Sequence, residues 1–131
     1  MLLVDILYNG ISVQAHFNKQ INFLIHNSGT GKTLLMQAII LYCKRNSISF
    51  KHIDYNNADI TASELVNLCK NSDVILLDNA DFYLTYDILK ELSNTAKHII
   101  ISMKNLYSIN MIESDEFFVD YNNLNLSIKR F

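Results

Sequence analysis

The chain has 131 residues, half of them hydrophobic, and a formal net charge of −2 at pH 7. This length supports one sizeable core, so we expect a single domain over residues 1–131. The small net charge gives no basic field that would attract nucleic acid. Because neither a long apolar run nor a basic leader is present, we expect a cytoplasmic protein without a membrane span.

The N-terminal segment contains two runs of β-type residues. Leu2–Tyr8 and Ile11–Phe17 flank the pair Asn9-Gly10. An Asn-Gly pair between such runs is typical of a two-residue hairpin turn. We therefore expect the domain to begin with a β-hairpin.

A glycine-rich segment follows this hairpin. Residues 20–33 have the sequence QINFLIHNSGTGKT, in which the apolar run Asn22–Ile25 leads into a turn that ends at Thr33. The segment fits the phosphate-binding pattern GxxxxGK[ST] except at the first glycine, where His26 stands. In that pattern backbone N–H groups hold the phosphates, the lysine reaches the β- and γ-phosphates, and the hydroxyl binds Mg²⁺. The predicted nucleotide-binding residues are Asn27, Ser28, Gly29, Thr30, Gly31, Lys32 and Thr33.

Two roles are open for the His26 side chain. It either fills the base of an altered loop or contacts a phosphate and responds to pH.

A second motif lies in residues 73–81, which have the sequence DVILLDNAD. Its four aliphatic residues are typical of a strand that is buried on both faces of a parallel sheet. At the carboxyl end of that strand, Asp78 would lie beside the phosphate loop and hold Mg²⁺ together with Thr33. The two motifs together predict a Mg²⁺-ATP site.

The remaining elements alternate between helices and strands. The helix over Lys32–Arg45 is apolar on more than one side, which predicts that the hairpin or another chain covers it. The other expected elements are a strand over Ser49–Asp54, a helix after Thr61, a helix near Thr85–Ser93, a strand over His98–Ser102, and a closing hairpin of Glu116–Asp120 and Leu124–Lys129 around Asn122-Asn123. This alternation predicts an α/β fold with a mainly parallel sheet plus N-terminal and C-terminal β-hairpins.

This layout resembles the additional-strand division of the P-loop NTPases, which includes the ABC and AAA+ ATPases. The resemblance implies a three-layer core with the strand order 5-1-4-3-2, and it assigns Ser102 to a polar sensor position beside the γ-phosphate. It also implies that a neighbouring subunit completes the site, often with an arginine. Together with the apolar helix and the aromatic residues Phe82, Tyr83 and Tyr86, this leads us to expect a protein partner or a homo-oligomer.

One departure from that family concerns catalysis. The family's catalytic glutamate directly follows the aspartate of the second motif, and here that residue is Asn79. An amide orients water but cannot take its proton, and a positioned general base contributes about 10²- to 10⁴-fold. Asp81 is either a substitute base or the cap of the next helix. The candidate catalytic residues are thus Lys32, Asp78, Asn79, Asp81 and Ser102.

Three functions stay open at this point. The first is a Mg²⁺-ATP-binding accessory or regulatory ATPase whose hydrolysis is slow or depends on a partner. The second, favoured by His26 and Asn79, is an inhibitor or adaptor derived from a P-loop protein, in which nucleotide is structural or is not bound. The third is a small nucleotide kinase; such enzymes clamp the phosphoryl group with arginines, whereas this chain has only Arg45 and Arg130.

Overall fold

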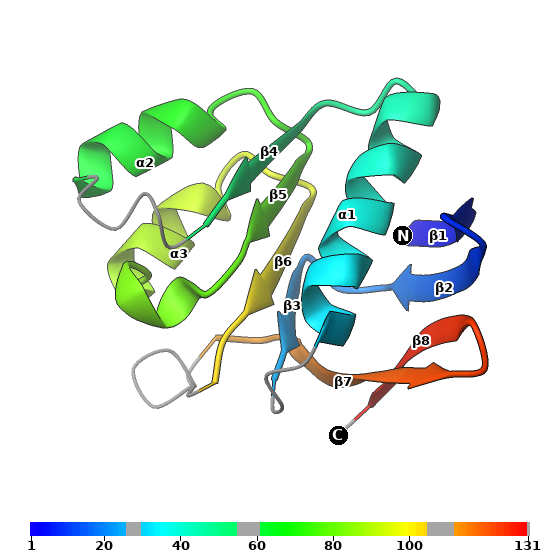
Figure 1. Ribbon diagram of the computed structural model, residues 1–131. Coiled ribbons are helices and arrows are strands. Elements are labelled where there is room, and N and C mark those ends of the chain that lie inside the picture. Colours follow the sequence, from blue (N-terminus) through cyan, green and yellow to red (C-terminus); the bar gives the residue numbers. More distant parts are fainter. Residues whose placement is uncertain (26–29, 55–60, 105–111, 131) are drawn as a thin grey trace.

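The computed structural model describes residues 1–25, 30–54, 61–104 and 112–130. These residues form one sheet with helices packed on it (Figure 1). The elements, in chain order, are β1 (Leu2–Tyr8), β2 (Ile11–Phe17), β3 (Ile21–Leu24), α1 (Thr30–Arg45), β4 (Phe50–Ile53), α2 (Ala62–Cys69), β5 (Val74–Leu77), the 3₁₀ turn η2 (Ala80–Phe82), α3 (Tyr86–Leu92), β6 (His98–Ser102), β7 (Asp115–Asn122) and β8 (Asn125–Arg130). Within this part of the chain, no helix has the length and apolarity needed to cross a bilayer.

The sheet has eight strands in the order β1-β2-β8-β7-β3-β6-β5-β4. The strands β7, β3, β6, β5 and β4 run parallel to one another and lie in the order that the resemblance implies for strands 5, 1, 4, 3 and 2. The whole sheet, however, is mixed, so the prediction of a mainly parallel sheet is wrong. Both hairpins belong to the same sheet. In each hairpin the two strands are joined by a two-residue turn and pair antiparallel.

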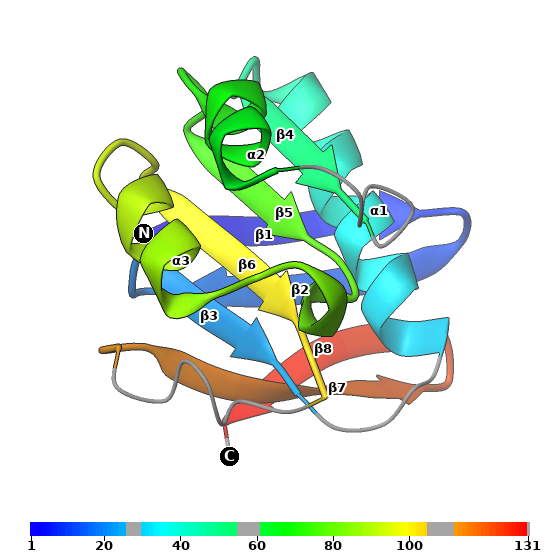
Figure 2. The ribbon, with the colours of Figure 1, turned by 90° about the vertical axis from the view of Figure 1, so that its left-hand side faces the viewer.

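The strand β8 joins the two hairpins. It pairs antiparallel with β7 on one side and parallel with β2 on the other, where Ser12 is opposite Asn125 (Figure 1). Figure 2 shows the four hairpin strands running across the central strands, which reflects the twist of the sheet. The two ends of the chain are thereby held in one hydrogen-bonded layer.

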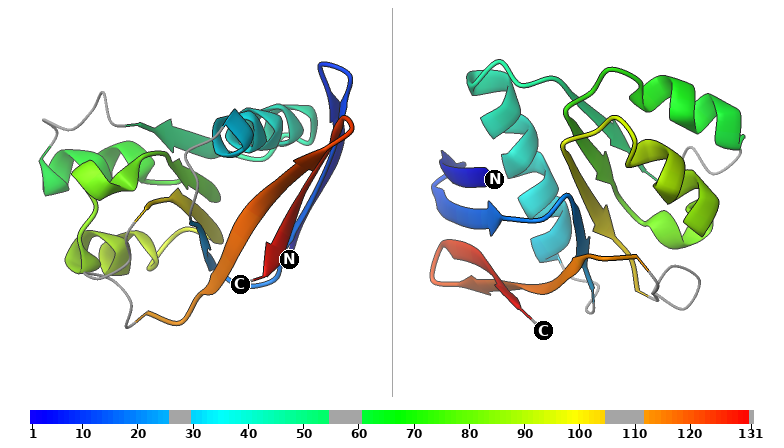
Figure 3. Two further views of the ribbon diagram at one scale, coloured as in Figure 1. Left: turned by 60° about the horizontal axis from the view of Figure 1, so that its bottom comes forward. Right: turned by 180° about the vertical axis from the view of Figure 1, so that it is seen from behind.

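Apolar residues cover both faces of the central strands. On one face, α1 packs on alternate strand residues such as Leu24, Leu76 and Ile100. On the other face, α2 and α3 pack on the intervening residues of the same strands, such as Phe23 and Ile101. Figure 3 (left) shows α1 and the pair α2 and α3 on opposite sides of these strands. The continuous aliphatic runs of the sequence follow from this burial on two faces.

The N-terminal hairpin covers the outer side of α1. Leu2 and Val4 of β1 belong to the same buried cluster as the helix, and the Tyr8 hydroxyl donates a hydrogen bond of 2.7 Å to Oε1 of Gln37. The sequence predicts that either the hairpin or another chain packs on this helix, and in the structure the hairpin does. The apolar surface of α1 no longer indicates a partner by itself.

Two local details correct the sequence predictions. The helix α3 is capped by Thr85, whose hydroxyl accepts a hydrogen bond of 3.3 Å from the Ile88 N–H, so Asp81 is not its cap. The closing turn consists of Asn123 and Leu124, both at positive φ, instead of Asn122-Asn123. The turn was misplaced because leucine seldom adopts this conformation.

Candidate functional site

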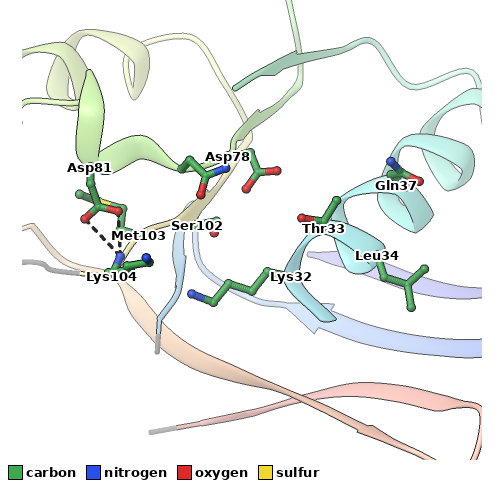
Figure 4. A pocket seen from close by; sticks show the side chains of 10 residues that line it. Lys32, Thr33, Leu34, Gln37, Asp78, Asp81, Ser102, Met103 and Lys104 are labelled. Carbon is green, nitrogen blue, oxygen red and sulfur yellow. Dashed lines mark hydrogen bonds between the residues drawn. The ribbon is translucent and has the colours of Figure 1, made fainter. Parts of the chain in front are cut away.

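A cavity of about 690 Å³ lies where three segments of the chain meet. These segments are the first turns of α1, the turn that follows β5, and the end of β6 (Figure 4). The cavity is therefore at the carboxyl ends of parallel strands, where open α/β sheets bind their ligands. Its lining residues are Lys32, Thr33, Leu34, Gln37, Asp78, Asn79, Asp81, Ser102, Met103 and Lys104.

Lys32 lies near the start of α1 and is only 7% exposed. Burial lowers the pKa of its ammonium group below the usual value; the Asp81 carboxylate raises this pKa, Lys104 lowers it, and Asp78 raises it. A cation held away from water beside two carboxylates costs stability, and such perturbed groups gather at functional sites.

Thr33 and Asp78 contribute oxygen atoms to the cavity. Figure 4 shows the Thr33 hydroxyl and the Asp78 carboxylate facing each other across it. Mg²⁺ is usually held by one or two protein oxygen ligands together with phosphate oxygens and water. This pair of residues therefore fits the metal that the sequence predicts.

The turn that carries Asp78 is fixed from its backbone. The Asp78 N–H donates to the Ile53 carbonyl at 2.8 Å, and the Tyr83 hydroxyl donates to the carbonyls of Asp78 (2.7 Å) and Ile53 (3.2 Å). Burial raises the pKa of the Tyr83 phenol, and the negative charge of Asp78 raises it further, so the phenol stays a neutral donor. Tyr83 thus faces inward, whereas Phe82 is 67% exposed and Tyr86 37% exposed.

Asn79 has a left-handed backbone, with φ 50° and ψ 47°. Asparagine and glycine adopt this conformation at lower cost than other residues. The backbone conformation at this position therefore favours the asparagine that occupies it.

Asp81 connects this turn to the end of β6. Both of its carboxylate oxygens accept the Lys104 backbone N–H, at 3.0 and 3.2 Å. Ser102, which is 4% exposed, is the last residue of β6 and lies opposite Leu24 of β3. The structure thus brings together Lys32, Thr33, Asp78, Asn79, Asp81 and Ser102 around one cavity.

The other predicted nucleotide-binding residues are only partly described. His26 and residues 27–29 lie outside the described residues, and of Thr30 only the helical backbone is described. At Gly31, a Cβ atom would lie 3.0 Å from Cγ1 of Val119, so glycine allows the start of α1 to approach β7 closely.

Lys104 was missed by the sequence reasoning. It belongs to no motif, and its one signal is a basic residue two positions after the expected end of a strand. Gln37, Leu34 and Met103 were missed as well, because helix and strand patterns do not say which side faces a cavity.

Comparison with known proteins gives one structural relative. No protein-family model and no curated protein sequence match the chain. Among solved structures, the chain is similar to AMPPCP-bound DnaA from Aquifex aeolicus, with a TM-score of 0.51 and 22% sequence identity. The match covers 74% of this chain and 36% of that one, so the chain spans about a third of the DnaA structure. The likeness is one of fold and extends over about three quarters of this chain.

Proposed function

We propose that this chain is a Mg²⁺-ATP-binding protein whose ATP hydrolysis is slow or depends on a partner. The observation that carries this proposal is the meeting of Lys32, Thr33, Asp78 and Ser102 around one cavity at the start of α1. A loop without a phosphate ligand would have no need for a buried lysine there. The nucleotide in the DnaA structure is consistent with this choice.

Each residue has a chemical role in this proposal. Lys32 and the amides of residues 27–31 bind the phosphates, with support from the positive end of α1. Thr33 and Asp78 would hold Mg²⁺, which would neutralise charge on the phosphates. The Ser102 hydroxyl would donate a hydrogen bond to the γ-phosphate.

Slow hydrolysis follows from the groups beside Asp78. Asn79 orients a water molecule but has no basic oxygen for its proton, and the Asp81 carboxylate accepts the Lys104 N–H. A partner that supplies a missing group would make the protein an accessory or regulatory ATPase, and the exposed Phe82 and Tyr86 suit an interface. The adaptor or inhibitor alternative keeps the same surface and dispenses with the nucleotide.

Thermal unfolding with and without Mg²⁺-ATP tests the proposal. A ligand at about 100 times its Kd adds roughly 2.7 kcal/mol to the free energy of unfolding, which is about 10 °C in Tm for a chain of this size. Lys32→Ala should remove the shift, whereas Lys44→Ala, at the other end of α1, should keep it. An unchanged wild-type Tm at millimolar nucleotide would favour the adaptor or inhibitor.

A further inference from the structure

Two of the described residues that line the cavity have cationic side chains, and both are lysines. Lys32 is the expected one and Lys104 is the additional one. Among the described residues, no arginine lines this cavity. Arg130 donates to the buried Asp115 at 3.2 Å, and Arg45 lies in the last turn of α1. A second positive charge for the phosphates is thus present within this chain, at Lys104.

Lys104 is held at the cavity by two backbone contacts. The Met103 N–H donates to the Leu24 carbonyl at 3.2 Å, which extends the pairing with β3 beyond β6. The next N–H, that of Lys104, is bound by the Asp81 carboxylate. Met103 belongs to the buried cluster under α2 and α3, and the three consecutive residues Ser102, Met103 and Lys104 all line the cavity.

The charges of the cavity indicate the kind of ligand that would fit between its lysines. Lys32 and Lys104 repel each other, since Lys104 lowers the pKa of Lys32. Asp78 and Asp81 offset the two lysines, so the lining groups are neutral overall at pH 7. Two cations that face one cavity are stabilised when an anion binds between them. A terminal phosphate beside Ser102 is such an anion.

We propose that Lys104 is a second phosphate-binding residue that contacts the terminal phosphate of a nucleoside triphosphate, and that Asp81 is the positioning residue that holds it. This inference rests on the proposed function and adds to it a preference for triphosphates over diphosphates. Lys32 reaches the β-phosphate, which ATP and ADP share, as well as the γ-phosphate, whereas Lys104 contacts only the γ-phosphate, which ADP lacks. The chain itself therefore supplies part of the charge that a partner arginine would otherwise provide.

Calorimetric titration of the full chain with Mg²⁺-ATP and Mg²⁺-ADP tests this assignment. Lys104→Gln removes the charge at similar length and keeps the backbone N–H. It should weaken ATP binding by about tenfold to hundredfold, the range for a hydrogen bond to a charged group, and change ADP binding less than about twofold. Lys104→Arg should retain the preference for ATP, and the exposed Lys90→Gln on α3 is the matched control.

Asp81 is tested by the same ratio of affinities. Asp81→Ala should reduce the preference for ATP over ADP, and Asp81→Asn, which keeps an acceptor oxygen, should preserve most of it. A general loss of structure would lower both affinities together and would not change their ratio.

The outcomes separate the two proposals. If wild-type protein binds neither nucleotide, the proposed function fails and this inference fails with it. If the wild type binds both nucleotides and Lys104→Gln leaves the ratio of the ATP and ADP affinities unchanged, the proposed function stands and the role of Lys104 is overturned. Equal melting temperatures of wild type and Lys104→Gln without nucleotide would show that the variant is folded.

Discussion

Replacing Asn79 by glutamate puts a carboxylate at the position to which the resemblance assigns the catalytic base, but it also strains the backbone. At φ 50° and ψ 47°, a residue other than glycine or asparagine costs roughly 1–2 kcal/mol. With about 2.1 cal/mol/K per residue, the 131 residues have an unfolding entropy of about 0.28 kcal/mol/K. A loss of about 1 kcal/mol should therefore lower Tm by about 4 °C in Asn79→Glu.

Two further substitutions separate strain from chemistry. Asn79→Ala should show the same loss in Tm without any gain in turnover, and Asn79→Gly should keep the wild-type Tm. Only Asn79→Glu should increase ATP turnover, by up to about 10²- to 10⁴-fold if the carboxylate meets the attacking water. Thermal melts and a phosphate-release assay measure the two effects.

Two results would refute this reasoning. Equal melting temperatures of the alanine and glycine variants would show that position 79 carries no conformational demand. Loss of turnover in Asp81→Asn, with no gain in Asn79→Glu, would make Asp81 the acting base and our assignment of Asn79 wrong.

Other substitutions test the packing and charges around the site. Gly31→Ala should cost about 1 kcal/mol because its Cβ would meet Val119, and adding Val119→Ala should recover part of that in a double-mutant cycle; full additivity would contradict the contact. Lys32→Met should raise the Tm of the nucleotide-free protein by a few degrees. Burial lowers the pKa of Lys32 in the folded protein, so above that pKa the unfolded chain binds more protons than the folded one. The free energy of unfolding of the wild type should therefore rise with pH towards 10.5, and the difference in Tm between Lys32→Met and the wild type should narrow. A constant difference would exclude the burial of the Lys32 charge as the cause. Arg130→Ala should lower the free energy of unfolding by about 1 kcal/mol, because Asp115 is buried, and should leave ATP turnover unchanged; lost turnover at unchanged Tm would place Arg130 in the site.

The sequence predicted those parts of the fold that depend on local patterns. Asn9-Gly10 gave the correct bounds of the first hairpin, because both residues adopt the positive φ that its turn requires. The helix expected after Thr61 is α2, and Thr61 caps it, since its hydroxyl accepts the Glu64 N–H. The motif residues from Lys32 to Ser102 converge because the carboxyl ends of parallel strands meet at one edge of the sheet.

Long-range pairing was not predictable in the same way. Nothing in the β-type runs indicates that β8 lies between β2 and β7, because each run can pair with any neighbour of suitable length. The Asp81 contact was missed for a similar reason, since its acceptor function depends on the position of Lys104, 23 residues away. Lys104 itself became visible only when the cavity was described.

The position of β8 has a consequence for the order in which the chain can fold during synthesis. The first hairpin contains local contacts and can close as soon as residues 1–17 are free, yet its inner edge pairs with residues 125–127. We expect that edge to stay open on the ribosome until β8 has emerged, and an open edge attracts chaperones or other nascent chains. Proteolysis of ribosome-bound chains of increasing length should show full protection of the hairpin only after β8 is released. Earlier protection would mean that packing on α1 is sufficient to close it.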